Sequence, residues 1–365
     1  MGRPRTANLQ MRGKGASAAT TVEPFLHFVS ANKKQFDSLL NRQLRMEQRR
    51  FPKAGKAVQA TTGALIALCQ RGGKRVRPAL LLAGAYCVTD SPNLDVLIQA
   101  GSALELLHSY FLVHDDWMDG DLVRRGGPSV HADLRAQLGN DALGDAAAIM
   151  AGDWGVAVAT DWMAKLAVPA GVLQPALSCF AEMQLAAVTG QIRDLLANDD
   201  QPLRTYELKT ASYTVNGPLR LGALLSGAKR SELDALEQYA LPLGVAFQLR
   251  DDMLGVFSPE LSTGKPFASD LRQGKRTVLL LEGLRRARRA DRALLDRVLG
   301  NPKASRRDLE RAVTFLSDSG ARAAVNEQIG TLAQKALLAL AKSRLRVPGK
   351  QLLASAVVAL TDRGS

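Results

Sequence analysis

The sequence predicts an all-α protein, a single domain of about ten or more helices packed around a central cavity. Apolar residues recur with helical spacing along most of the chain. Almost no segment alternates with period two, and clusters of β-branched residues are sparse. The stretches rich in Gly and Pro are short loops rather than linkers, so the 365 residues, of which 46% are hydrophobic, are expected to share one core.

The helices are predicted in chain order. The first covers Thr21 to Arg50, and the second covers 55–70, where Gly72-Gly73 breaks the pattern. Arg77-Pro78 opens the third, with Pro in a first-turn position where its missing N–H costs nothing. The later helices are predicted at 94–119, 142–168, 175–196, 205–226, 231–256, 277–299, 307–317, 321–345 and 352–360.

The net charge of +13 is concentrated near the N-terminus. Through Lys56 there are twelve Lys and Arg against three Asp and Glu. Residues 1–20 are expected to form a disordered basic tail ahead of a helical domain at 21–365. A nucleic-acid-binding arm is one alternative, but stacking aromatics and a recognised module are lacking, so we expect no nucleic-acid partner. Positive potential also suits an anionic substrate.

The cysteines indicate a reducing compartment. Cys69, Cys87 and Cys179 are far apart, lack metal-ligand spacing and are expected to be unpaired core thiols. No apolar run approaches the ~20 residues needed to cross a bilayer, and no hydrophobic signal core follows the basic start. A cytoplasmic protein without stable membrane insertion is therefore expected.

One predicted helix ends in a cluster of carboxylates. Asp115 and Asp119 are four residues apart and so share one helix face, with Asp116 beside them. Carboxylates packed this closely require a cation, and they are hard ligands suited to Mg²⁺, which shares its shell with waters and substrate phosphates. Arg124 and Arg125 follow as cationic forks that grip phosphate oxygens. The pattern indicates a diphosphate site, the alternative being a solvated helix end.

A second acidic helix end strengthens that interpretation. Phe247 to Asp252 reads FQLRDD, and Lys265, Asp270 and Lys275 follow it. Two acidic ends in one helical chain can face each other across a cavity and hold metal ions between them. The loop from Ser258 to Asp270 follows the second end and is predicted to be a lid.

These residues resemble the trans-isoprenyl diphosphate synthases of the polyprenyl synthetase family, over about residues 60 to 280. Six blocks occur in the family's order: Gly72-Gly73-Lys74-Arg75-Val76-Arg77-Pro78; Asp115-Asp116-Trp117-Met118-Asp119 with Arg124-Arg125-Gly126; Gly190-Gln191 with Asp194; Lys209-Thr210-Ala211; Phe247-Gln248 with Asp251-Asp252; and Gly264-Lys265 with Asp270 and Lys275. The resemblance implies an isoprenoid-synthase fold and a homodimer.

The resemblance also implies a reaction and its ligands. An allylic diphosphate would condense with isopentenyl diphosphate through Mg²⁺-dependent ionisation, condensation and loss of a proton. Three Mg²⁺ ions are expected. Their implied ligands are Asp115, Asp119 and Asp251, with Asp116, Asp252 and Asp270 in or near the shells.

The remaining roles follow from the same resemblance. The allylic diphosphate would be neutralised by Arg124, Lys209, Lys265 and Lys275. The isopentenyl diphosphate would be held by Lys74, Arg77, His108 and Arg125. Oxygen dipoles from Thr210 and Gln248, with the Lys209 carbonyl, would stabilise the allylic cation.

The second acidic motif departs from the family's pattern, because Gly255 stands where many members have Asp. The site either binds metal through Asp251, Asp252 and Asp270 alone, which we favour, or is weakened. A catalytically silent regulatory subunit is thus one alternative of another class. A terpene cyclase is a second, against which the GGKRVRP block and Arg125 argue, because a cyclase has no use for an isopentenyl diphosphate site.

The side chains just before the first acidic cluster predict the product. Tyr110 and Phe111 precede Asp115 by five and four residues and are predicted to form the floor of the product tunnel. Two bulky rings there favour a C15 product, farnesyl diphosphate. If one ring faces the core instead, a deeper tunnel and a C20 geranylgeranyl product are expected.

Overall fold

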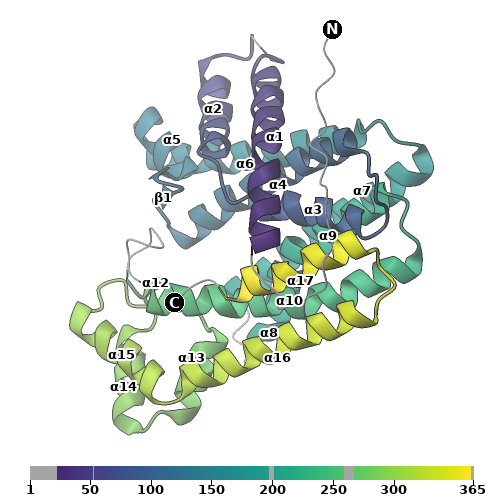
Figure 1. The fold of residues 1–365 in the computed structure, drawn as a ribbon. Coiled ribbons are helices and arrows are strands. Elements are labelled where there is room, and N and C mark those ends of the chain that lie inside the picture. The colour runs from purple at the N-terminus through teal and green to yellow at the C-terminus, as the bar shows by residue number, and fades with distance from the viewer. Residues whose placement is uncertain (1–22, 52, 197–200, 259–266, 363–365) are drawn as a thin grey trace.

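The computed structural model describes residues 23–51, 53–196, 201–258 and 267–362. It confirms the all-α class, since helices make up most of the described chain and its one sheet is a two-stranded hairpin (Figure 1). The first elements are α1 (Glu23–Gln48), α2 (Lys56–Gln70), α3 (Val76–Tyr86), α4 (Leu94–Asp119), β1 (Val123–Arg124), β2 (Gly127–Pro128), α5 (Val130–Leu138), α6 (Asp141–Ala164) and α7 (Ala170–Leu196). The later ones are α8 (Pro202–Tyr206), the π-helix η1 (Glu207–Asn216), α9 (Gly217–Leu225), α10 (Arg230–Phe257), α12 (Ser269–Arg272), α13 (Val278–Arg286), α14 (Arg289–Val298), α15 (Arg306–Asp318), α16 (Ala321–Lys342) and α17 (Val347–Thr361).

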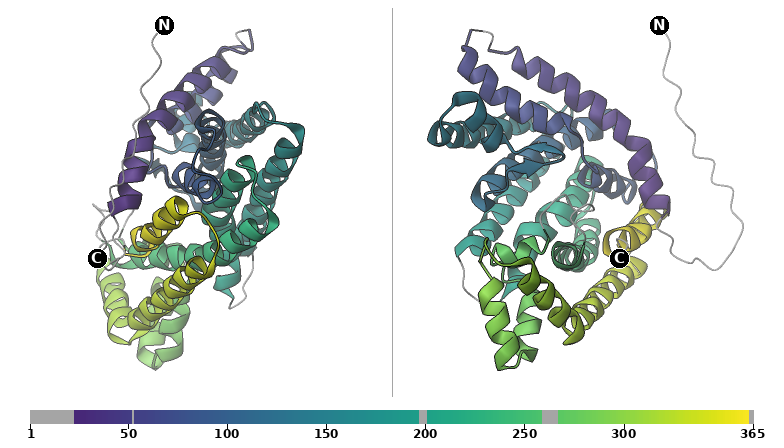
Figure 2. Two further views of the ribbon diagram at one scale, coloured as in Figure 1. Left: turned by 45° about the vertical axis from the view of Figure 1, so that its right-hand side comes forward. Right: turned by 90° about the vertical axis from the view of Figure 1, so that its left-hand side faces the viewer.

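The helices pack in layers around α4 and α10. The α1–α2 pair lies at one end of the bundle, and the short helices α13, α14 and α15 form a lobe at the other end (Figures 1 and 2). Helix α4 packs against α6, α1 and α3, whereas α10 packs against α16 and η1. This arrangement brings the C-terminal ends of two long helices toward one cavity.

Two helices are longer and more apolar than expected from the sequence. Helices α4 and α6 would pass for membrane-spanning segments by length and composition, which contradicts the expectation that no apolar run approaches that length. In α4, 67% of the apolar window is buried inside the protein, as in the core helix of a globular fold. In α6 only 39% is buried, so an apolar face of this helix remains uncovered.

Several predicted boundaries were wrong. The segment predicted as one helix at 277–299 breaks between α13 and α14, where Ala287 adopts an extended conformation. Helix α7 begins before Pro175, which lies inside it, and α17 is longer than predicted. The hairpin and α5 were not predicted. The break between α13 and α14 contains neither Gly nor Pro, so the sequence carries no ordinary signal for a helix end there.

The segment predicted as one helix at 205–226 is continuous but not regular. Its middle ten residues form the π-helix η1, flanked directly by α8 and α9. Such wide turns are rare and occur frequently at functional sites. The three cysteines are free and buried, as expected.

Candidate active site

A pocket of about 210 Å³ lies where α4, η1 and α10 meet. Its lining combines the acidic, basic and polar residues that the sequence motifs single out. The lining residues are Arg77, His108, Phe111, Leu112, Asp115, Ala187, Gln191, Lys209, Thr210, Tyr213, Thr214, Phe247, Gln248 and Asp251. The structure therefore brings five of the six sequence blocks, far apart in the chain, to one cavity.

The wall formed by α4 follows from helical spacing. His108, Phe111, Leu112 and Asp115 are separated by three, one and three residues, so they form one stripe along the helix. Tyr110 is not on this stripe. Its ring packs against His114, with ring centroids 4.6 Å apart, and lies beside Gly152 of α6. Of the two predicted floor residues, only Phe111 lines the pocket.

The acidic end of α4 is neutralised by basic side chains. Asp116 is fully buried and accepts hydrogen bonds from Nε (2.7 Å) and Nη2 of Arg124. Burial outweighs that pairing and raises the pKa of Asp116 to about 6. Lys275 contacts Asp119 at 3.3 Å. Burial alone would lower the pKa of Lys275, but the charges of Asp119, Asp270 and Asp194 hold that pKa above its usual value.

The hairpin that carries the two arginines is held by a residue outside the motifs. Nη1 of Arg71, at the end of α2, donates hydrogen bonds of 2.7 Å to the carbonyl oxygens of Arg124 and Pro128. A Cβ at Gly127 would lie 2.8 Å from that guanidinium, so a side chain there would displace Arg71 from its present position. Arg125 adopts a left-handed conformation with φ of 52°. Its guanidinium lies beside Gly73, in the predicted diphosphate loop.

The acidic end of α10 is stabilised differently. Asp252 is buried and does not line the pocket. Its oxygens accept hydrogen bonds from the Tyr206 hydroxyl and from Nε2 of Gln248, the latter at 2.7 Å. Burial, together with the nearby charge of Asp270, raises the pKa of Asp252 to about 8. Asp251, by contrast, lines the pocket, as Asp115 does.

The space beside Gly255 is occupied by another carboxylate. A Cβ built at Gly255 would lie 2.2 Å from Oδ2 of Asp270, which is itself buried. The missing carboxylate of the second motif is therefore matched by one that arrives from α12. Lys265, predicted to bind the same substrate, lies outside the described residues.

The GGKRVRP block is anchored through Arg75, whose side chain is almost fully buried. Its guanidinium donates to Glu105 of α4 and, at 2.7 Å, to Asp37 of α1. Arg77 donates to Thr214 Oγ1 at 2.8 Å and lies over the Tyr213 ring at 4.5 Å. The loop is thereby fixed to three helices.

Polar groups without protein partners accumulate at the pocket. Nε of Arg77, Nδ1 of His108, Oε1 of Gln191 and Oη of Tyr213 are buried, and none makes a hydrogen bond within the described part of the chain. Burial, reinforced by Arg77 and Arg125, lowers the pKa of His108 well below its usual value, so the ring is neutral at pH 7. Buried groups left unpaired in this way suit a polar ligand.

Two of the residues predicted to be catalytic, Thr210 and Gln248, are joined by a hydrogen bond. Thr210 Oγ1 donates to Gln248 Oε1 at 2.5 Å, and the amide of Gln248 in turn binds Asp252. Lys209 pairs with Asp194 at 2.7 Å. Lys74 is exposed at the edge of its loop and is absent from the pocket lining.

The carboxylates suit metal ions that are shared with a ligand. Among the described residues, no three His, Cys, Asp or Glu side chains lie close enough to hold an ion by themselves. Asp115 and Asp251 nevertheless face the same pocket from opposite helices. Mg²⁺ usually binds through one or two carboxylates plus substrate phosphates, and the divided donor set fits that mode.

The comparisons with known proteins agree with this geometry. The model of the family described as Polyprenyl synthetase matches residues 58–316. The chain belongs to the polyprenyl synthetase family.

Relatives within the family differ in their named products. The geranylfarnesyl diphosphate synthase of Aeropyrum pernix is 34% identical over 71% of this chain and 80% of its own. The (2E,6E)-farnesyl diphosphate synthase of Mycobacterium bovis is 36% identical over 56% and 55%. Among solved structures, the geranylgeranyl pyrophosphate synthase of Corynebacterium glutamicum, complexed with isoprenyl diphosphate and magnesium, aligns with a TM-score of 0.84 and 28% identity over 91% and 99%. The chain is therefore a trans-isoprenyl diphosphate synthase by family, and its product length is not determined by these relatives.

Some residues that shape this polyprenyl synthetase site were missed by sequence reasoning. Arg71, Glu105, Tyr206 and Thr214 hold motif residues in place by hydrogen bonds over long sequence separations. None has a local pattern that reveals its partner, since Glu105 and Thr214 read as ordinary helix positions. The sequence offers one signal for the other two residues, which is their closeness to a motif. Arg71 adjoins the glycine pair, and Tyr206 lies three residues before Lys209.

Proposed function

We propose that the protein condenses isopentenyl diphosphate with an allylic diphosphate. The observation that carries the proposal is one pocket whose lining combines Asp115 of α4 and Asp251 of α10 with the basic or polar side chains of Arg77, His108 and Lys209. Acidic groups that need cations and basic groups that need anions share this space, and a metal-bound diphosphate satisfies both.

The carboxylates would hold Mg²⁺, with Asp115, Asp119 and Asp251 as ligands and Asp270 near them. Bound there, the ions would neutralise the diphosphate leaving group as its bond to the allylic carbon breaks. We propose three ions per site, as the resemblance implies. Asp252 would act by positioning Gln248, because both of its oxygens accept hydrogen bonds from protein groups.

The cationic side chains would bind the two diphosphates. Lys209 and Lys275, with Arg124, lie at the acidic helix ends and would neutralise the allylic diphosphate, aided by Lys265. Lys74, Arg77, His108 and Arg125 would hold isopentenyl diphosphate. In its neutral form, the His108 ring would donate a hydrogen bond rather than a charge.

The reaction needs no protein nucleophile. When the C–O bond of the allylic substrate breaks, its electron pair leaves with the diphosphate. The oxygens of Thr210 and Gln248 are dipoles that stabilise the resulting cation. The double bond of isopentenyl diphosphate then forms the new C–C bond, and a proton passes to the released diphosphate.

We propose farnesyl diphosphate as the main product. The ring of Phe111 lines the pocket and is braced by Tyr213 at 4.8 Å and Tyr110 at 4.9 Å. Geranylgeranyl diphosphate is the second candidate, favoured by the position of Tyr110 outside the pocket lining. Phe111→Ala should lengthen the product, and Tyr110→Ala should lengthen it less, because Tyr110 acts only through Phe111.

The deciding experiment is incubation with Mg²⁺, isopentenyl diphosphate and each of dimethylallyl, geranyl and farnesyl diphosphate, followed by chain-length analysis. Accumulation of C15 with farnesyl diphosphate untouched supports both the chemistry and the Phe111 floor. Conversion to C20 would still support the proposed condensation, but it would show that Phe111 does not stop the product at C15. No elongation by folded, metal-loaded protein would leave the silent regulatory subunit as the better account.

We also propose a cytoplasmic homodimer, without a nucleic-acid partner or stable membrane insertion. Helices α6 and α7 expose a run of large apolar side chains that no described element covers. These are Leu143, Met150, Leu185, Val188, Ile192, Leu195 and Leu196. Patches of this kind mark interfaces. Leu185→Glu should shift the mass measured by light scattering toward a monomer, whereas Leu338→Glu on α16 should not.

A further inference from the structure

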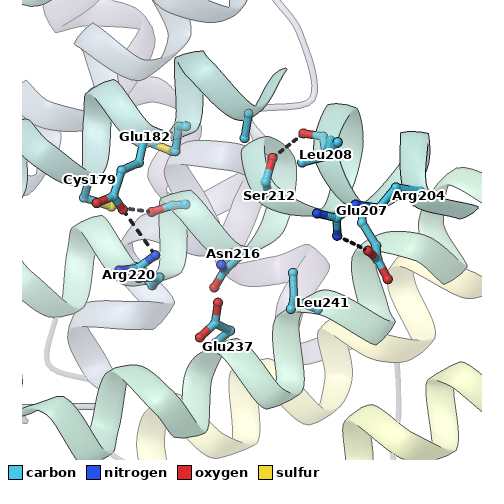
Figure 3. A pocket seen from close by; sticks show the side chains of 13 residues that line it. Cys179, Glu182, Arg204, Glu207, Leu208, Ser212, Asn216, Arg220, Glu237 and Leu241 are labelled. Carbon is cyan, nitrogen blue, oxygen red and sulfur yellow. Dashed lines mark hydrogen bonds and ion pairs between the residues drawn. The ribbon is translucent and has the colours of Figure 1, made fainter. Parts of the chain in front are cut away.

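The π-helix η1 separates two pockets. Lys209, Thr210, Tyr213 and Thr214 face the active-site pocket, whereas Glu207, Leu208, Ser212 and Asn216 line a second one. The second pocket has a volume of about 270 Å³ and lies between α7, η1, α9 and α10 (Figure 3). It is larger than the active-site pocket and shares no lining residue with it. The proposed reaction makes no use of it.

The charges around the second pocket are unevenly matched. Arg204 pairs with Glu207 at 2.7 Å, and Arg220 lies 3.5 Å from Glu182. Glu237, the fifth charged lining residue, has no hydrogen-bond or ion-pair partner among the described residues. The lining therefore carries one carboxylate more than its arginines can neutralise.

A buried amide adds a second unmatched acceptor. Asn216 is only 6% exposed, and its Oδ1 has no hydrogen-bond partner in the part of the chain that is described. Figure 3 shows Asn216 of η1 and Glu237 of α10 projecting into the space between their two helices. Burying such an oxygen without a donor is costly, which indicates that a donor belongs there.

Most of the remaining lining is apolar, with Met183, Leu208 and Leu241 on three different elements. We infer that this pocket binds a small organic cation, an ammonium group on a short apolar chain, with the ammonium between Glu237 and Asn216. A bare metal ion fits poorly, because no cluster of three metal-ligating side chains occurs within the described ranges. An anion would meet the unpaired carboxylate.

Binding there should influence the active site through η1. A ligand that draws Asn216 toward α10 acts on the same ten-residue element that carries Lys209 and Thr210. A shift of η1 would therefore couple the second pocket to the active site, in keeping with the frequent occurrence of π-turns at functional sites. This second step rests on the proposed function, whereas the binding step does not.

The test of binding is calorimetric titration of the full chain with n-butylammonium. The isosteric neutral n-butanol and the anion butyrate serve as matched probes. We expect saturable binding of n-butylammonium that is on the order of tenfold tighter than that of n-butanol, and no binding of butyrate. Equal affinity for the alcohol, preference for the anion, or no saturable binding of n-butylammonium would overturn the inference.

Variants locate the site. Glu237→Gln removes the charge with little change in shape and should weaken n-butylammonium binding about tenfold. Glu327→Gln removes the same charge from an exposed position on α16 and should leave binding unchanged. Ala186→Leu, which fills the pocket from α7, should also weaken binding. Binding that survives both pocket variants would place the cation elsewhere.

Turnover measurements then separate binding from coupling. In wild-type protein, n-butylammonium should change the rate of chain elongation at least twofold, and the Glu237→Gln variant should need about tenfold more n-butylammonium for the same change. Binding without an effect on rate would overturn the coupling and keep the site. If the protein forms no product with any primer, the titrations still decide whether the pocket binds a cation.

Discussion

Each of the two acidic helix ends contains a buried carboxylate, and the two carboxylates are paired with different kinds of group. At the end of α4, the buried carboxylate of Asp116 is matched by the guanidinium of Arg124. At the end of α10, the buried carboxylate of Asp252 is matched by neutral donors from Tyr206 and Gln248. The pKa is raised by burial in both cases, to about 6 for Asp116 and to about 8 for Asp252.

The difference shows how each end contributes to the site. A charge pair keeps Asp116 ionised near neutral pH and fixes the hairpin that carries the two arginines. At the α10 end, burial and the charge of Asp270 outweigh the hydrogen bonds from the neutral donors and raise the pKa of Asp252 to about 8, so this end presents less negative charge at neutral pH. The α4 end is therefore expected to depend on its cation, and the α10 end on its packing.

The largest expected effect comes from removing the cation at the α4 end. Arg124→Leu leaves Asp116 buried and unpaired, which should lower the free energy of unfolding by about 3–5 kcal/mol. Denaturant titration at pH 8 measures this loss. Because Arg124 lowers the pKa of Asp116, that pKa should lie above 6 in the variant, so the loss should shrink as the pH falls toward about 6 and level off below it.

The matched control is Arg285→Leu, because Arg285 pairs with Glu282 on an exposed surface. It should cost no more than about 1 kcal/mol. Equal losses for the two variants, or a loss for Arg124→Leu that does not depend on pH, would contradict the role assigned to this pair.

A smaller effect is expected from restoring the family's carboxylate at the α10 end. Gly255→Asp places a side chain against Oδ2 of Asp270, so overpacking should cost about 1–3 kcal/mol and reduce turnover. Adding Asp270→Ala should recover part of the stability by opening the space. A single Gly255→Asp variant with higher activity and unchanged stability would show that the two carboxylates do not compete.

A smaller loss of stability is expected when the hydrogen bond from Tyr206 at the α10 end is removed. Tyr206→Phe removes the donor to Asp252 and the acceptor of the Val278 N–H, at 3.3 Å. The unfolding free energy should fall by about 1–2 kcal/mol. Since Gln248 is held by the same carboxylate, kcat should fall more than KM changes. Tyr86→Phe removes a hydroxyl that makes no hydrogen bond within the described chain, and it should be nearly neutral.

The smallest effect concerns the α4 wall farther from its acidic end. Burial and the nearby arginines lower the pKa of His108 in the folded state, so the unfolded chain binds more protons below about pH 6.5. The contribution of His108 to stability should therefore fall as the pH decreases from about 7 to 5. His108→Gln should flatten that slope, whereas His27→Gln, on the exposed face of α1, should leave it unchanged.

The sequence by itself determined the helical class, the order of the motifs and the family. Helical periodicity and short acidic or glycine-rich blocks are local properties, so they can be read without knowing what packs against them. The same local reading located Asp115, Asp251, Lys209 and Gln248, each of which lies at or beside the pocket.

Only the tertiary structure decided how those residues are held and which of them face the cavity. The rotation of α4 turned Phe111 into the pocket and Tyr110 toward α6, a difference of one residue that periodicity cannot resolve. Tyr206, which donates a hydrogen bond to Asp252, lies 46 residues away in the chain. Burial and long-range contacts set the protonation and geometry of such residues, and neither exists until the helices pack.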